Sequence, residues 1–327
     1  MTAVEHRTYT YVGTRPVRHD GLEKVTGKAR FAADLDMTGQ LRGAMVRSPH
    51  AHARIRSIDT SAAEAMPGVK AVATGADFPT LDINDPAHDE AVNIIARDEA
   101  LYHGHVVAAV AATTAAQARA AAAAVEVDYE VLPAVLSIDE AVADGAPIAN
   151  HANRTLFTGD TEPSNLASVG QFDRGDVAQG FADADVVIER HFTTVAVHQG
   201  YIEPHACVAD CGQDGKATIW ASSQGHFAVR SKTAATLGWG TDRIKVIPAE
   251  IGGGFGGKTT IYLEPLAVLL SQKAARPVKM VMTREEVLRA TGPAPGSKMH
   301  VKMGASRAGE LTTLQATLYY SCGSFKG

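Results

Sequence analysis

The sequence has few cysteines and no arrangement of them that suggests a covalent framework. Cys207, Cys211 and Cys322 are too few and too scattered for a set of disulfides in 327 residues. The four thiolates that hold an iron–sulfur cluster are missing. Cys207 and Cys211 stand close together with His205 nearby, which raises a metal site as one interpretation. No second Cys or His pair follows at the spacing of a zinc site, so we favour buried strand thiols and expect no metal ligands here.

Long apolar runs and runs of a single charge are also missing. Every apolar run is interrupted too early to cross a bilayer, so we expect no membrane span. Residues 1–7 lack the apolar core of a secretory signal, which predicts a cytoplasmic location. The net charge is -5, with 31 basic and 36 acidic residues interspersed, and no basic stripe is available for nucleic acid.

The length and the local patterns predict two domains, because 327 residues exceed the usual size of a single core. After an N-terminal extension over residues 1–20, residues 21–138 alternate strand patterns with alanine-rich helical patterns. Residues 139–169 are rich in Ala, Asp, Asn, Gly and Pro without a sustained period, which predicts a linker. Residues 170–327 are dominated by strands. The expected strands cover residues 41–47, 69–74, 106–112, 125–131, 186–192, 206–209, 217–221, 244–247, 278–283, 299–303 and 311–320, and the expected helices residues 59–66, 114–124, 227–237 and 261–274.

A glycine-rich run, IGGGFGGKTT at residues 251–260, is the most informative stretch. Glycine tolerates positive φ and close approach, so this main chain is suited to contact a ligand. Successive free amides in such a turn form a concave site for an anion or an oxo group. A flexible turn without a ligand is less favoured, because flexible linkers usually carry Ser whereas this run carries Phe255 and Lys258.

One candidate ligand is a nucleotide phosphate, because residues 252–259 match the phosphate-loop pattern GxxxxGK[ST]. Such a loop normally follows the first strand of a parallel sheet, with several βα units and an acidic metal-binding residue after it. Only 70 residues follow Gly257, and the strand expected at 278–283 has no aspartate at its end. The last elements alternate like an antiparallel hairpin about Gly309. A phosphate loop therefore stays as the alternative function.

Ordered motifs favour another function. They are GTRPVRHDGLEKVTGKARF at residues 13–31, MVRSPHAHA at 45–53, EPH at 203–205, WASSQ at 220–224 and the glycine run at 252–258. Together they resemble the molybdenum-binding subunit of the xanthine oxidase family of molybdenum hydroxylases. The resemblance implies an α+β fold, in which an α/β-hammerhead domain precedes the first part of a molybdopterin-binding α+β domain. It also implies a molybdopterin cofactor with molybdenum, expected in the cytosine dinucleotide form.

The resemblance assigns cofactor contacts to four residues. The side-chain amide of Gln224 is expected to donate to the apical oxo ligand of molybdenum, and the backbone amide of Phe255 to the same centre. Gly254 and Gly256 would let the loop pass beside the cofactor. A neutral amide can donate to an oxo group without adding charge, and a glycine-flanked backbone can approach closely, so the residue types agree with these roles.

Substrate contacts are expected from Thr259 and Glu203. Purine-oxidising relatives place a glutamate at the position of Thr259, and threonine cannot supply its charge-assisted contact, which makes xanthine a poor candidate substrate. Glu203 is similar to the family's glutamate beside the pocket, with a structural ion pair as the open alternative. Lys258 is expected to have a structural role or to act from outside the first layer of contacts.

The catalytic base of the family, a glutamate, has no matching motif in this chain. Glu250 stands next to the glycine run and is interpreted as the end of a strand. The base is therefore expected in a partner chain, and the chain alone is expected to be inactive. The layout is similar to the medium molybdopterin subunit of nicotinate dehydrogenase, the N-terminal half of a divided subunit, and a natural division is our hypothesis.

The family resemblance implies three partner chains and a reaction class. The partners are the C-terminal half of the molybdopterin subunit, a subunit with 2Fe-2S clusters and a subunit with FAD. The implied reaction hydroxylates an electron-poor carbon of an N-heterocyclic, aromatic or aldehyde substrate, with water as the oxygen source.

Overall fold

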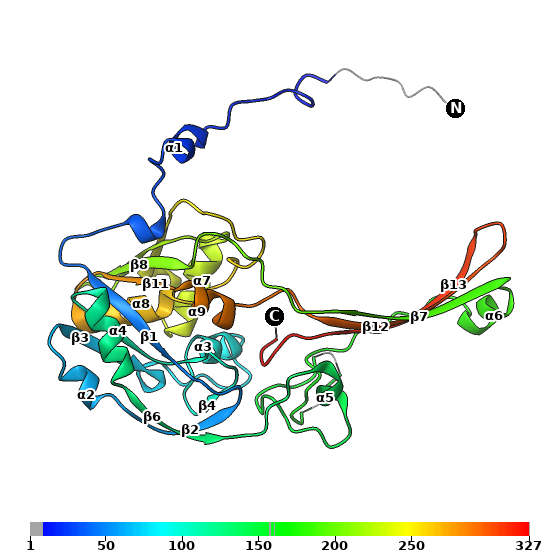
Figure 1. The fold of residues 1–327 in the computed structure, drawn as a ribbon, viewed down its shortest axis with the longest axis horizontal. Coiled ribbons are helices and arrows are strands. Elements are labelled where there is room, and N and C mark those ends of the chain that lie inside the picture. Colours follow the sequence, from blue (N-terminus) through cyan, green and yellow to red (C-terminus); the bar gives the residue numbers. More distant parts are fainter. Residues whose placement is uncertain (1–8, 157, 160, 327) are drawn as a thin grey trace.

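The computed structural model of the chain describes residues 9–156, 158–159 and 161–326. They form a body from which an extended N-terminal segment and a long three-stranded arm project (Figure 1). The α-helices are α1 (Gly21–Val25), α2 (Ser61–Glu64), α3 (His88–Ile94), α4 (Ala115–Ala123), α5 (Ile138–Val142), α6 (Val177–Ala182), α7 (His226–Thr236), α8 (Glu264–Ala274) and α9 (Arg284–Ala290). The strands are β1 (Leu41–Arg47), β2 (Ala53–Asp59), β3 (Val69–Thr74), β4 (Glu99–Ala100), β5 (Val106–Ala112), β6 (Glu126–Val131), β7 (Val186–Thr194), β8 (Ala206–Cys211), β9 (Ala217–Ala221), β10 (Ile244–Pro248), β11 (Val278–Val281), β12 (Ser297–Ala305) and β13 (Leu311–Tyr320).

One seven-stranded sheet unites the two halves of the sequence in the body, in the order β10-β9-β8-β11-β1-β5-β3. Strands β1, β5 and β3 come from the first half and the others from the second. The junction is a parallel pairing of β1 with β11, in which Leu41 lies opposite Val278 and Gly43 opposite Met280. A Cβ at Gly43 would come within 2.6 Å of the Met280 side chain, so the junction needs a glycine there.

Strand β5 shows how the body is packed. All seven of its residues are buried, and alternate side chains enter two different clusters. Ala109 and Ala111 belong to the main core, which contains Leu266 and Leu270 of α8. Val110 points the other way, into the cluster that includes Ala121 of α4. Helices thus cover both faces of the strand, and its continuous apolar sequence is the pattern expected of a doubly covered strand.

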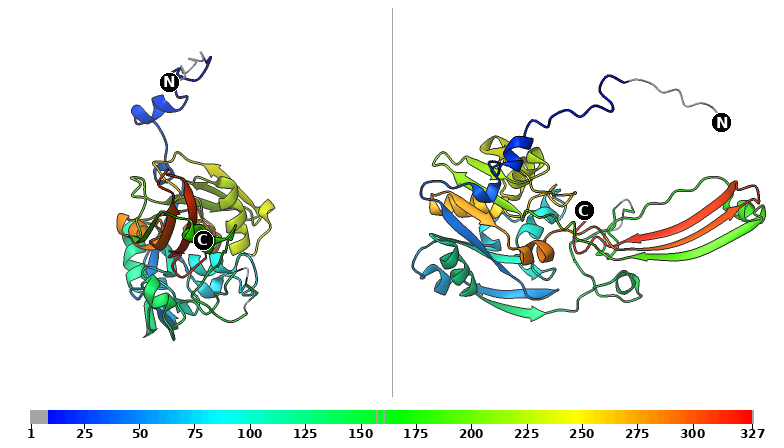
Figure 2. Two further views of the ribbon diagram at one scale, coloured as in Figure 1. Left: turned by 90° about the vertical axis from the view of Figure 1, so that its right-hand side faces the viewer. Right: turned by 45° about the horizontal axis from the view of Figure 1, so that its top comes forward.

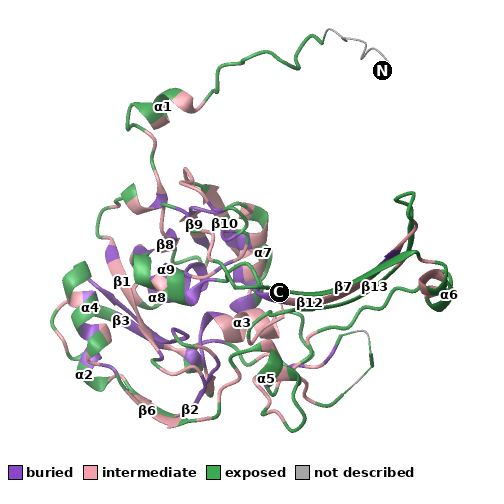
Figure 3. Ribbon diagram, turned by 45° about the vertical axis from the view of Figure 1, so that its right-hand side comes forward, coloured by how far each residue is buried: buried purple, intermediate pink, exposed green. Residues whose placement is uncertain are grey.

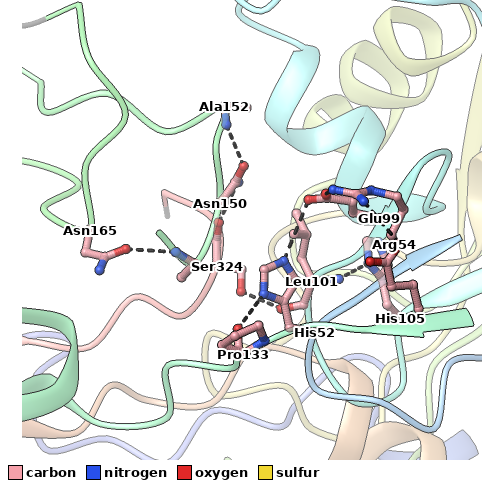
Figure 4. A network of polar contacts seen from close by, with 12 residues as sticks. His52, Arg54, Glu99, Leu101, His105, Pro133, Asn150, Ala152, Asn165 and Ser324 are labelled. Carbon is pink, nitrogen blue, oxygen red and sulfur yellow. Dashed lines mark hydrogen bonds and ion pairs between the residues drawn. The ribbon is translucent and has the colours of Figure 1, made fainter. Parts of the chain in front are cut away.

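A second sheet of three strands, β4-β2-β6, completes the first half of the body. A polar network then ties this half to the last residues of the chain (Figure 4). Ser324 donates from Oγ to the carbonyl of Leu101 at 2.6 Å, and its backbone carbonyl accepts from Nδ2 of Asn150 at 2.8 Å. The buried ring of His105 accepts from the amide of Leu101 at 3.1 Å. The segment after β13 therefore returns from the arm to the body.

Most expected elements are confirmed, with shifts at their ends. Helix α8 begins at Glu264 rather than at residue 261, with Pro265 in its first turn. The Glu264 carboxylate accepts from the amides of Tyr262 and Leu263, which stops the helix from extending backwards. The segment expected as a linker, 139–169, contains most of α5, which a reciprocal capping box stabilises.

The arm consists of β7, β12 and β13 in the order β13-β12-β7, and it extends well away from the body (Figure 2). Both pairings are antiparallel, and β12 and β13 are joined by a turn in which Gly309 has φ of +89°. Helix α6 lies against the arm, where a Cβ on Gly180 would come within 2.7 Å of Thr313. The expected hairpin about Gly309 is confirmed.

The expected N-terminal extension is described only from residue 9, since residues 1–8 lie outside the described part. Residues 9–20 extend away from the body, and an ion pair between Lys24 and Glu250 holds the following helix α1 near it. Cys207 and Cys211 are buried in β8, as expected of strand thiols. None of the described helices is both long enough and apolar enough to span a membrane.

Candidate functional site

The glycine-rich run lies at one edge of the body sheet. Strands β9 and β10 are parallel neighbours, so their C-terminal ends meet at the same edge. The glycine run follows β10, and Gln224 follows β9. The amide of Gln224 donates to the carbonyl of Lys258 at 2.9 Å, and Ser223 donates from Oγ to the same carbonyl at 3.2 Å. These bonds place Gln224 directly beside the glycine run, as the motif order predicted.

The carboxamide of Gln224 has a defined orientation. Its Oε1 accepts from the backbone amides of Gly256 at 3.0 Å and Lys258 at 3.2 Å. Two donors at the oxygen identify the other end as the NH2 group. Within residues 9–156, 158–159 and 161–326, no acceptor is bonded to that Nε2, and the residue is exposed. The side chain therefore presents two N–H donors outward.

In the run, the amides of Gly252, Gly256, Gly257 and Lys258 are hydrogen-bonded, whereas those of residues 253–255 have no acceptor among the described residues. Gly253, Phe255 and Gly256 have φ of +95°, +49° and +90°, and positive φ is uncommon for a residue such as Phe255. The Phe255 side chain is 75% exposed, and its amide has no acceptor among the described residues. A Cβ on Gly254 would overlap the side-chain amide of Gln224, so only glycine permits the close approach. Successive amides in such a turn form a donor-lined concavity.

A buried ion pair supports the run from the interior. Lys258 Nζ lies 2.7 Å from Oε2 of Glu203, and the same oxygen accepts from the amide of Gly252 at 2.7 Å. The Lys258 side chain is fully buried and Glu203 is 10% exposed. Burial lowers the pKa of Lys258, and the Glu203 carboxylate opposes that shift. This geometry favours the ion-pair interpretation of Glu203 over a direct substrate contact, and it agrees with the structural role expected of Lys258.

Sequence patterns did not reveal the importance of Tyr201. Its buried ring lies under the run, 2.8 Å from where a Cβ on Gly257 would be, and Lys258 Nζ lies 5.0 Å from the ring centroid. Its hydroxyl and Nε2 of His205 are 2.7 Å apart, and burial lowers the pKa of His205 to about 3. Tyr201 stands two residues before the EPH motif, but a single tyrosine carries no sequence signal of its own for this supporting role.

The same geometry opposes the phosphate-loop alternative. The lysine of such a loop reaches the phosphates, whereas Lys258 is turned inward and paired with Glu203. The helix after a phosphate loop begins at its lysine, but α8 begins only at Glu264. Strand β10 also lies at the edge of the sheet rather than in its centre. Nucleotide binding by residues 252–259 is therefore not supported.

Thr259 lies at the border between the run and a large open cavity. Its Oγ1 donates to the carbonyl of Gly256 at 2.9 Å. The cavity has a volume of about 1020 Å³ and lies between α3, the segment after the run, the end of α9 and the C-terminal segment. Its lining includes Glu90, Tyr102, Arg154, Lys232, Thr259, Thr260, Tyr262, Arg289 and Phe325. Across the described residues, no three His, Cys, Asp or Glu side chains gather as ligands for a metal ion.

Comparison with protein families agrees with this arrangement. Residues 26–133 match the family described as aldehyde oxidase and xanthine dehydrogenase, a/b hammerhead domain, and residues 158–327 match the molybdopterin cofactor-binding domain. The chain belongs to the xanthine oxidase family of molybdenum hydroxylases. The expected α+β fold, a hammerhead domain followed by part of a molybdopterin-binding domain, is confirmed. The boundaries at 20, 138 and 169 stay predictions.

Individual family members cover almost the whole chain. The large molybdopterin subunit of nicotinate dehydrogenase from Eubacterium barkeri is 31% identical over 98% of this chain and 72% of its own length. The match is to the large subunit, whereas the layout of the sequence resembled the medium subunit of that enzyme. The carbon monoxide dehydrogenase large chain from Afipia carboxidovorans is 32% identical over 96% of this chain, which spans only 40% of that relative.

Solved structures of the family show the same fold. Quinoline 2-oxidoreductase from Pseudomonas putida 86 superposes with a TM-score of 0.81 and 30% identity. The match covers 94% of this chain and 39% of the solved chain. The chain thus spans less than half the length of several family members, and it contains the part with the hammerhead domain and the first molybdopterin-binding region.

Proposed function

We propose that this chain is the cofactor-binding section of a hydroxylase or dehydrogenase that oxidises an electron-poor carbon of an N-heterocyclic, aromatic or aldehyde substrate, with water as the oxygen source. The observation that carries the proposal is a pair of donors at the glycine run, Nε2 of Gln224 and the amide of Phe255, which have no acceptor in the part of the chain that the structure describes. Both are neutral and both residues are exposed, while Thr259 at the end of the run lines a cavity large enough for a small ring system.

The residues present fit a molybdopterin cofactor with molybdenum. Gln224 and Phe255 would hold it by donating hydrogen bonds, while Gly254 and Gly256 give the backbone room to approach. When bound, the molybdenum centre supplies the oxygen transfer and accepts the electrons of the reaction. The donors of this chain are oriented in advance, because Gln224 Oε1 is already held by two amides. Preoriented donors stabilise developing negative charge without reorganising.

Thr259 would contact the substrate from the cavity side. Its hydroxyl is held by the Gly256 carbonyl, so it offers a fixed, uncharged surface. A substrate that depends on a carboxylate at this position, such as xanthine, is expected to react poorly. Glu203 would act indirectly, by holding Lys258 and the amide of Gly252 in place.

The proposal includes chains that complete the enzyme. The catalytic base is assigned to the C-terminal half of the molybdopterin subunit, and the electrons pass on to subunits with 2Fe-2S clusters and FAD. The cytosine dinucleotide form of the cofactor, a cytoplasmic location and inactivity of the isolated chain belong to the same proposal. Elemental analysis of the assembly purified from its native host, with mass spectrometry of the released pterin, tests these points together.

The sharpest test is the substitution Gln224→Ala in the assembled enzyme. Loss of one preoriented donor is expected to lower kcat about 100-fold, with molybdenum content and subunit composition unchanged. Gln213→Ala removes an exposed glutamine from the turn between β8 and β9 and serves as the matched control. Equal turnover of the two variants at equal molybdenum content would remove Gln224 from the site. Absence of molybdenum from the native assembly would overturn the proposed function itself.

A further inference from the structure

The two faces of the arm differ strongly in composition. Residues paired across antiparallel strands point to the same side of a sheet. Met303 of β12 is paired with Ile188 and Leu314, and Met299 is paired with Phe192 and Leu318. Continuing this register places several apolar side chains on a single side, and we name six large exposed ones among them the apolar arm face: Ile188, Phe192, Met303, Leu314, Leu318 and Tyr320.

The opposite side, the polar arm face, has contacts of its own. His300 Nε2 lies 2.7 Å from a carboxylate oxygen of Glu189, and the rings of His191 and His300 stack at 4.3 Å. Lys302 Nζ lies 5.1 Å from the ring centroid of Phe181 in α6. Helix α6 therefore lies on the polar arm face and leaves the apolar one uncovered.

In Figure 3 strands β7 and β13 are coloured mostly as exposed and β12 mostly as intermediate, and the residues of the apolar arm face are themselves exposed. Phe192 is 53% exposed, Leu314 58% and Tyr320 58%, and the other three residues of the face are between 36% and 53% exposed. A sheet with one polar and one apolar face normally buries the apolar one. A contiguous exposed patch of this kind marks an interaction surface.

The relatives indicate what covers it. The match to quinoline 2-oxidoreductase omits 6% of this chain, about 20 residues, whereas the three arm strands hold 9, 9 and 10. At least part of the arm therefore belongs to the shared fold. In that solved chain more than half of the residues have no counterpart here, because this chain covers 39% of it. We propose that the apolar arm face docks the section of the molybdopterin subunit that has no counterpart in this chain.

The charges on the apolar arm face argue against two other occupants. Arg190, which pairs with Val301, is the one charged residue of β7 on this side. Its guanidinium donates to the carbonyl of Glu189, and the described residues give it no carboxylate. A second copy meeting this face with its own would bring another Arg190. Lys298 and Lys302 lie on the polar arm face, so a lipid surface would find one cation only. The occupant is expected to supply a carboxylate opposite Arg190.

The proposal rests on the proposed function, and matched substitutions in neighbouring positions test it. Phe192→Glu with Leu318→Glu places charges on the apolar arm face, and Thr193→Glu with Thr317→Glu places them on the polar arm face, where both threonines are exposed. The full chain, tagged at its N-terminus, is purified from the native host. Mass spectrometry then identifies the docked section among the co-purified proteins by its similarity to the part of quinoline 2-oxidoreductase that this chain does not cover. We expect at least a tenfold loss of recovery for the apolar pair and less than twofold for the polar pair.

Equal recovery with both pairs would overturn the docking surface. So would a dimer of this chain, measured by light scattering, that only the apolar pair dissociates, or binding to phosphatidylcholine–phosphatidylglycerol vesicles that only this pair removes. If the section belongs to the same polypeptide as this chain, protection of the β13 amides from hydrogen exchange is measured in place of recovery. Loss of protection with the apolar pair alone would support the docking surface, and equal protection with both pairs would overturn it. Recovery of the section without molybdenum would contradict the proposed function alone, whereas molybdenum with equal recovery would contradict the docking surface alone.

Discussion

Strands β5 and β7 both begin with apolar residues, but β5 is buried and β7 is exposed. Every residue of β5, VVAAVAA, is buried between helices on both sides of the body sheet. Every residue of β7, VVIERHFTT, is exposed on the arm, although it begins with three β-branched apolar residues. The contrast shows that strand propensity is local, whereas burial depends on whether another element covers the face.

The glycine run is part of the body, and buried side chains support it from the interior. It is exposed where Phe255 protrudes, yet it is held from behind by Tyr201, Lys258 and Glu203. The body thus supports a site from its interior, whereas the arm exposes a surface that we propose binds another part of the enzyme.

The largest effect is expected from Val110→Asp in the centre of β5. Val110 is fully buried, so the carboxylate would be buried without a partner and would destabilise the chain by more than about 4 kcal/mol. We expect the variant to be recovered unfolded, as circular dichroism and urea titration would show. A cooperative transition close to that of the unchanged chain would mean that the body core is far less constrained than its packing indicates.

The next effect is expected from Lys258→Met, which leaves the Glu203 carboxylate buried with only the Gly252 amide. Removing one partner of a buried ion pair costs about 3 kcal/mol. Urea titration should show this loss, and adding Glu203→Gln should restore part of it. Lys302→Met in the arm removes an exposed cation and is the control, for which we expect no measurable change. A Lys258→Met variant as stable as that control would show that the pair does not support the run.

Acid should destabilise the body through its buried histidines. Burial lowers the pKa of His105 to about 4, from an ordinary value near 6.5. Between these values the unfolded chain binds a proton that the folded chain does not, so stability falls as the pH drops from 6.5 towards 4. The loss from His105 approaches about 3 kcal/mol at pH 4. His105→Gln should flatten the dependence of the free energy of unfolding on pH in urea titrations, and a slope equal to that of the unchanged chain would contradict this assignment.

The smallest effect is expected from Ile188→Asp on the apolar arm face. Ile188 is 53% exposed in the chain alone, so the substitution should change the free energy of unfolding by no more than about 0.5 kcal/mol. Thermal unfolding of the chain alone is the measurement. A loss as large as that of Val110→Asp would mean that the face is already buried, and the comparison between the two strands would fail.

Several elements followed from local patterns. The alternation and continuous apolar runs predicted most of the strands, and the family resemblance carried by three ordered motifs implied that Gln224 and the glycine run meet. Pro265 could have corrected the start of α8, because proline favours the first helical turn. The parallel pairing of Leu41 with Val278 had no local signal, since it joins residues more than two hundred positions apart and depends on how the whole sheet packs.

Most of the strands, the longer helices apart from their ends, the family and the residue types at the glycine run followed from the sequence alone, because they depend on periodicity, on turn chemistry and on motif order. Strands β2 and β4 and the short helices α1, α3, α5, α6 and α9 did not. Only the tertiary structure decided that Lys258 turns inward to Glu203 and that the Gln224 amide points its N–H groups outward. It alone left one face of the arm uncovered. The reason is physical: a side chain's orientation and burial are set by the partners that folding brings within a few ångströms, and those partners come from distant parts of the chain.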